Sequence, residues 1–193
     1  MNALVYDIEI IKAIPQKGEA TVEGVEYCKG WGDHANMGVS VIGAYDYVEK
    51  RYRVFCEDNF DEFFDLIYQR SLLVSFNGIG FDNKVLNAVG SGKLGMPIHE
   101  GYYDVLLEIW KSAGGRFKGS GLDAVCEANS LGKKSGHGAL APIQWQRGER
   151  GAVIDYCLND VKMTKGLFEL CQRGPIKSAR GELRLRRVDA HVD

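Results

Sequence analysis

Hydrophobic residues in the first half of the chain form short runs of the kind found in buried strands. Residues 3–11 are mostly apolar and carry two acids near the end of the run. Apolar and polar residues alternate in 39–45 and in 52–56, which a polar turn separates, and 72–76 is again apolar. Short apolar runs bounded by turn residues are typical of strands. We therefore expect a sheet in which 39–45 and 52–56 continue the first strand in antiparallel order.

Helical spacing of apolar residues appears after these strands and dominates the second half of the chain. The first such segment is 60–68, which follows the candidate capping residues Asp58 and Asn59. The same spacing predicts further helices at residues 81–89, 103–110, 122–129 and 150–172. A few strands followed mostly by helices indicate one α/β domain, in which helices flank a mixed sheet.

Two stretches follow neither period. Residues 15–38 are irregular and rich in glycine, which indicates an insertion or a long hairpin between the first two strands. After the stop signal Gly174-Pro175, residues 175–193 form a basic tail that binds nucleic acid, pairs with a partner or is disordered. We expect a single domain over residues 1–174, followed by this tail.

Composition narrows the class of protein. The chain has 193 residues, of which 45% are hydrophobic and 26% charged, as in a single globular domain. Its net charge of -2 excludes a protein that coats nucleic acid through an overall excess of positive charge. We expect neither secretion nor membrane contact, because a signal-peptide pattern and an apolar run of about 18–20 residues are both missing. The five cysteines form no Cys-x-x-Cys pair, which favours reduced thiols in a cytoplasm.

The first candidates for chemistry are the two acids of the first predicted strand. Asp7 and Glu9 are two residues apart, so their side chains lie on the same face of that strand. Neighbouring like charges repel, and bound cations relieve the repulsion. A lone Asp-x-Glu pair is nevertheless more often the solvated end of a strand, so this pair needs further acids to define a metal site.

Further acids follow later in the chain. Asp82 comes after the strand at 72–76 and a glycine-rich turn, where it either joins a site at the end of the sheet or charges a helix N-terminus. Tyr156 and Asp160 share a face of the last helix; taken alone, they fit a tyrosine at the edge of the core and an exposed acid. Together with the strand acids, these oxygen ligands can build a site for two Mg²⁺ or Mn²⁺ ions. No His or Cys cluster in the sequence competes for that role.

Three motifs, in this order, resemble those of the DEDDy 3′–5′ exonucleases of the ribonuclease H-like superfamily. The motifs are Asp7-Ile8-Glu9, Asn77-x-x-x-Phe81-Asp82 and Tyr156-x-x-x-Asp160. The resemblance spans residues 3–172 and is strongest to the proofreading domain of family B DNA polymerases and its stand-alone bacterial and phage relatives. Tyr156 indicates the tyrosine subtype, because Asp155 stands where the other subtype has histidine.

The resemblance implies a hydrolase that removes nucleoside 5′-monophosphates from the 3′ end of DNA, with single-stranded DNA as the expected substrate. Two divalent ions, Mg²⁺ or Mn²⁺, would be the cofactors. Asp7, Glu9 and Asp160 would share one ion, and Asp7 would hold the second together with Asp82, directly or through water. Tyr156 would orient the attacking water. The resemblance also implies a cytoplasmic protein of a bacterial cell or phage-infected host, with a replication or recombination protein as a partner.

Candidates for contact with nucleic acid are Ile10, Asn77, Phe81, Lys133 and Lys134. Ile10 and Phe81 are neighbours of site acids and either stack against terminal bases or belong to the core. The lysines lie in a basic loop that either contacts phosphates or is a solvated surface. Two alternatives remain open: a 3′ exoribonuclease with the same site, and a non-catalytic nucleic-acid-binding subunit, which has no need of four acids and a tyrosine. The irregular residues 15–38 depart from the family and bear on substrate fit.

Overall fold

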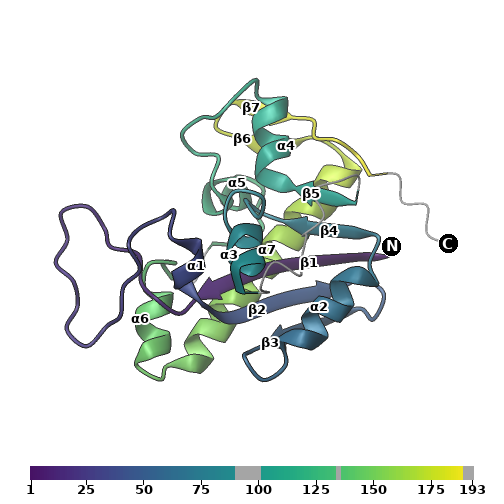
Figure 1. Cartoon of the computed structure of the whole chain (residues 1–193). Coiled ribbons are helices and arrows are strands. Elements are labelled where there is room, and N and C mark those ends of the chain that lie inside the picture. Colours follow the sequence, from purple (N-terminus) through teal and green to yellow (C-terminus); the bar gives the residue numbers. More distant parts are fainter. Residues whose placement is uncertain (90–100, 134–135, 189–193) are drawn as a thin grey trace.

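The computed structural model describes residues 1–89, 101–133 and 136–188, which form one α/β domain around a five-stranded mixed sheet (Figure 1). The strands are β1 (Ala3–Ile10), β2 (Val39–Asp46), β3 (Arg51–Phe55), β4 (Leu72–Ser75) and β5 (Tyr102–Asp104). Their order is β3-β2-β1-β4-β5, with antiparallel pairs from β1 to β3 and parallel pairs from β1 through β4 to β5. The expected mixed sheet flanked by helices is confirmed, and it is compatible with a ribonuclease H-like fold.

Helices cover both faces of the sheet. They are α1 (His34–Met37), α2 (Phe60–Tyr68), α3 (Asp82–Val89), α4 (Val105–Ser112), α5 (Leu122–Ala128), α6 (Ala141–Gln146) and α7 (Arg150–Arg173). Leu4 and Ile8 of β1 pack with α2 and α3, whereas Val5 packs with α4, α5 and α7 on the other face (Figure 1). Asp7 and Glu9 have the same phase as Val5 along the strand, so both acids lie on the face that α7 covers.

The region expected to be a helix over 103–110 begins instead with a strand. β5 pairs Tyr102 with Leu73 and ends at Asp104, and α4 begins only at Val105. The Asp104 carboxylate accepts hydrogen bonds from the N–H groups of Leu106 and Leu107, at 3.1 and 3.3 Å, and so caps the helix. A three-residue strand has no recognisable period, which is why the sequence pattern joined it to the helix.

The start of α2 also differs from the expected capping. Asn59 occupies the N-cap position, but its side chain does not cap the helix. Its Oδ1 accepts a hydrogen bond from the Cys56 N–H at 2.7 Å and closes the turn that follows β3. A short Asn side chain can accept a hydrogen bond from the helix that follows it or from the turn that precedes it, and here it bonds to the turn.

Residues 11–38, all of which the structure describes, leave the sheet after β1 and return at β2. They follow an irregular path with a single bridge between Ala13 and Tyr27, and end in the short helix α1. This insertion projects beyond the end of β1, beside α6 (Figure 1).

The described part of the tail packs on the domain. It forms a hairpin of β6 (Ile176–Ser178) and β7 (Gly181–Leu183). Ile176, Leu183 and Leu185 are buried in the same cluster as α4 and α7. In the described ranges, no helix combines the length and the apolar character needed to cross a membrane.

Candidate active site

The acids of β1 lie where the sheet meets α7. Asp7 is opposite Gly43 of β2, and a Cβ on Gly43 would lie only 2.9 Å from Cys157 Sγ. The missing side chain at Gly43 therefore lets α7 pack closely on the sheet at this point. The Cys157 thiol donates to the Asp7 carbonyl at 3.5 Å, which ties the helix to the strand beside the acid. The register shifts between Glu9 and Ile10, so the regular pairing of β1 with β2 is interrupted directly after the second acid.

A hydrogen bond to β1 brings in Asp82. The ladder between β1 and β4 runs only as far as Val5 and Val74. Beyond it, the Ile8 N–H donates to Asp82 Oδ1 at 3.2 Å. The side chain at the start of α3 thus takes the place of a strand partner, and its carboxylate lies between the positions of Asp7 and Glu9 along β1.

The turn that precedes Asp82 is held by hydrogen bonds to the Asp104 side chain. Asp104 Oδ1 accepts from the Asn77 N–H at 3.0 Å, and Oδ2 accepts from the Ile79 N–H at 3.1 Å. Asn77 has a left-handed φ of 67°, a conformation that Asn tolerates better than most residues. Burial raises the pKa of Asp104, although the backbone N–H groups around it favour the charged form. We did not expect this residue; an Asp directly before a helix is the N-cap signal that would have pointed to it.

The helix α7 supplies the last two predicted side chains. Tyr156 and Asp160 are one turn apart and both are buried, with Asp160 only 3% exposed. The chain passes closely over the tyrosine ring, because a Cβ on Gly136 would lie 3.3 Å from Tyr156 Cδ2. Packing against this segment and against the buried Val41 and Ala141 therefore fixes the direction of the Tyr156 side chain.

One cavity of about 370 Å³ brings these segments together. Among its lining residues are all the acids and the tyrosine of the three motifs, with two further predicted residues: Asp7, Glu9, Asp82, Tyr156, Asp160, Asn77 and Phe81. Ile10 lies outside this lining, in an adjoining cavity. Lys133 lines neither cavity, since its side chain is largely exposed and pairs with Glu127 at 2.7 Å. Lys134 lies outside the described residues.

The donor atoms suit a hard divalent cation. Asp7, Glu9 and Cys157 each offer one ligand atom, and these three atoms lie within 4.8 Å of one another. Burial, and then the charges of Asp7 and Glu9, hold the pKa of the Cys157 thiol well above its ordinary value. In the metal-free protein the thiol is therefore protonated. Sulfur is also a poor ligand for a hard cation, so the carboxylate oxygens are the suitable donors. Oxygen ligands of this kind are those that Mg²⁺ and Mn²⁺ prefer.

Comparisons with known proteins bear on the fold. No model of a known protein family matches the sequence, and no curated protein matches it. The structure is similar to part of the family B DNA polymerase from the hyperthermophilic archaeon Pyrobaculum calidifontis, with a TM-score of 0.62 and 19% sequence identity. The match covers 87% of this chain and 24% of the polymerase chain. The chain thus shares its fold with about a quarter of a much longer protein.

Proposed function

We propose that this chain is a metal-dependent 3′–5′ exonuclease that hydrolyses the terminal phosphodiester bond of DNA and releases nucleoside 5′-monophosphates. The observation that carries the proposal is that three distant segments, β1, the start of α3 and the middle of α7, contribute four acids and a tyrosine to one cavity. The fold likeness to part of a family B DNA polymerase supports it. The order of the three motifs, which resembles that of the DEDDy exonucleases, supports the tyrosine-dependent type.

The four carboxylates would hold two divalent ions, Mg²⁺ or Mn²⁺. Such ions, when bound, polarise the phosphate, lower the pKa of a water and stabilise the leaving oxygen. The role of the protein is to hold the oxygen ligands in place before the substrate binds. Asp7 and Glu9 are fixed by the β1 ladder, Asp82 by its bond to the Ile8 N–H, and Asp160 by its place inside α7. Ligands fixed in this way need little rearrangement during the reaction.

Tyr156 is proposed to hold the attacking water. Its side chain lines the same cavity as the acids, and a Cβ on Gly138 would lie 3.4 Å from its hydroxyl oxygen. A hydroxyl on a ring held this firmly can orient a water without taking part in metal binding. Tyr156 would therefore act on the rate of the reaction and not on the affinity for the ions.

Polarity of digestion tests the proposal. DNA and RNA oligonucleotides, single- and double-stranded and labelled at either end, are incubated with Mg²⁺ or Mn²⁺, and the products are resolved by length. We expect DNA to shorten from its 3′ end, a 3′-phosphate to block digestion and a 5′ block to leave it unchanged.

Each other outcome points elsewhere. Label released first from an internal or 5′ position contradicts an exonuclease of this polarity. Digestion of RNA with intact DNA identifies the exoribonuclease instead, through its use of the 2′-hydroxyl. Binding of DNA without any cleavage in either metal identifies the non-catalytic subunit.

A further inference from the structure

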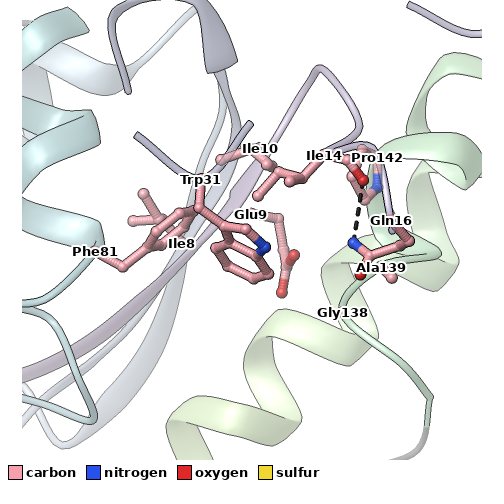
Figure 2. A pocket seen from close by; sticks show the side chains of 10 residues that line it. All are labelled: Ile8, Glu9, Ile10, Ile14, Gln16, Trp31, Phe81, Gly138, Ala139 and Pro142. Atoms are coloured by element: carbon pink, nitrogen blue, oxygen red, sulfur yellow. Dashed lines mark hydrogen bonds between the residues drawn. The ribbon is translucent and has the colours of Figure 1, made fainter. Parts of the chain in front are cut away.

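A second cavity, of about 220 Å³, adjoins the carboxylate cavity, and the insertion forms one side of it. The two cavities share Ile8, Glu9, Phe81 and Gly138 in their linings, so one opens beside the other. The remaining walls come from the end of β1 (Ile10), from the insertion (Ile14, Gln16 and Trp31) and from the chain at the start of α6 (Ala139 and Pro142) (Figure 2). Apart from Glu9 and Gln16, these side chains are apolar.

Trp31 forms an aromatic wall of this second cavity. Its ring meets the ring of Phe81 edge to face, with centroids 5.9 Å apart and an interplanar angle of 66°. The His34 ring of α1 also packs against the Phe81 ring, with ring centroids 6.1 Å apart. Figure 2 shows the indole beside Phe81 and Ile8, facing the space around Glu9. Trp31 is nevertheless 64% exposed, so part of this aromatic side chain is available to a ligand.

Between the buried residues Cys28 and Met37, hydrogen bonds hold this part of the insertion in place. The Asp33 carboxylate accepts from the Lys29 N–H at 2.8 Å and from Asn36 Nδ2 at 2.6 Å, and so closes the loop that carries Trp31. At the base of the insertion, Gln146 of α6 donates to the carbonyl oxygens of Ile11 and Glu26, at 2.8 and 3.1 Å. Gln146 also accepts from the Glu26 N–H at 2.7 Å. The aromatic wall is therefore presented on a fixed frame.

The chemistry of the cavity selects the class of ligand. A phosphate or a sugar would find few polar partners among these walls, whereas a flat ring can lie against an indole and aliphatic side chains. Nucleobases are such rings, and stacking on an aromatic side chain tolerates any base because every base has a π-face. Since the cavity opens beside the four carboxylates, a nucleotide with its phosphate among them can reach it with its base.

We propose that Trp31 stacks on the base of the 3′-terminal nucleotide and is a specificity-determining residue for DNA ends. The proposal rests on the proposed function, because it takes the carboxylate cavity as the place of the terminal phosphodiester. A base that enters a walled cavity has left its stack and its pair. The cost of that step is least for a single-stranded or mismatched end, so these ends are the substrates that the insertion favours.

Binding is measured with a 5′-labelled oligothymidylate whose terminal linkage is a phosphorothioate, in Ca²⁺ to slow hydrolysis. Trp31→Ala should weaken binding about 5- to 150-fold, the loss expected when one base loses its stacking partner. Trp31→Phe should keep most of the affinity. Tyr68→Ala is the matched control, since Tyr68 is also 64% exposed but lies at the end of α2, away from both cavities; it should bind like wild type. Thermal unfolding of each variant checks its fold.

An abasic 3′-terminal nucleotide identifies the base that Trp31 contacts. If Trp31 stacks on the terminal base, removing that base should weaken binding to wild type at least as much as Trp31→Ala weakens binding of the intact end. The two losses should not add when combined. Fully additive losses, or an unchanged affinity for Trp31→Ala, would overturn the proposal.

Activity distinguishes failure of this inference from failure of the proposed function. If wild type digests DNA from the 3′ end but Trp31→Ala digests it with unchanged KM and kcat, the stacking role is wrong and the exonuclease stands. If wild type binds the oligonucleotide in a Trp31-dependent way but cleaves nothing in Mg²⁺ or Mn²⁺, the exonuclease is wrong and the base-binding role stands. We expect Trp31→Ala to raise KM with little effect on kcat, because the lost contact is made before and during the reaction alike.

Discussion

The two adjoining cavities are built by different means. The carboxylate cavity is formed by the sheet and by the long helix α7. Asp7 lies in β1, which has a partner strand along each edge, and Asp160 lies in the middle of α7. The aromatic cavity is carried by an irregular insertion, which side-chain amides and carboxylates tie to α6 and to itself. This contrast suggests that the fold holds the atoms for bond cleavage rigidly, while the insertion sets which end of a substrate fits. Substitutions on the two sides should accordingly affect different constants.

The largest effect is expected at Asp7. Asp7→Asn keeps the shape of the side chain but removes a charge from the proposed ligand set, so kcat should fall by about 10³-fold or more. Metal affinity, measured by titration calorimetry with Mn²⁺, should fall with it. The free energy of unfolding without metal should stay the same or rise, because one repulsive charge has gone. A variant that keeps wild-type activity would remove Asp7 from the metal site.

Tyr156→Phe is expected to come next. The ring keeps its packing beneath Gly136, and only the hydroxyl is lost. The single-turnover rate should drop by about 10- to 10³-fold, comparable to the loss of one group that positions a reactant. Mn²⁺ affinity should not change. Equal rates for Tyr156→Phe and wild type on every substrate would show that the tyrosine only fills space.

Asp104 tests how firmly the turn before Asp82 must be held. Asp104→Asn leaves one acceptor oxygen for the N–H groups of Asn77 and Ile79, so we expect a loss of about 1–3 kcal/mol in the free energy of unfolding. The displaced turn should lower kcat by about 10- to 100-fold while KM changes little. Chemical denaturation and steady-state kinetics measure the two effects. Lower stability with unchanged kcat would mean that Asp104 supports the fold without positioning the site.

The raised pKa of Asp104 predicts how the difference in stability between wild type and Asp104→Asn changes with pH. Burial raises its pKa above the ordinary value of 3.8, so the folded state binds the proton more tightly than the unfolded state. The stability advantage of wild type over Asp104→Asn should therefore be greatest at acid pH, and should shrink as pH rises from that value through the raised pKa. An advantage that grows with pH over this window would contradict the burial effect.

The smallest effect is expected on the insertion side. Gln146→Leu removes the amide that holds Ile11 and Glu26 to α6, so the frame of Trp31 loosens. KM for single-stranded DNA should rise about 2- to 10-fold, in line with the loss of one or two ordinary hydrogen bonds, and kcat should stay near wild type. A fall in kcat with an unchanged KM would mean that the insertion supports the carboxylates and not the substrate.

Sequence patterns were most informative where an apolar period is clear or where several motifs follow one another in a fixed order. The strands at 39–45 and 52–56 and the long last helix follow from their apolar periods, and the order of the three motifs picks out side chains that line one cavity. The pattern missed α6, although Pro142 at its start is a helix signal, because the surrounding glycines hide a six-residue element. Trp31 was missed for a different reason. Its partner Phe81 is 50 residues away in sequence, and nothing local to an irregular insertion indicates where its side chains lie.

The central claim is that the four carboxylates form a metal-dependent site for phosphodiester hydrolysis, and metal removal tests it most directly. Single-turnover hydrolysis of a 3′-labelled single-stranded DNA is measured in excess EDTA and again after Mg²⁺ or Mn²⁺ is restored, with the released nucleotide identified by mass. We predict no hydrolysis in EDTA, full recovery with either ion and a nucleoside 5′-monophosphate as the product. Undiminished hydrolysis in EDTA, or release of a nucleoside 3′-monophosphate, would contradict the account.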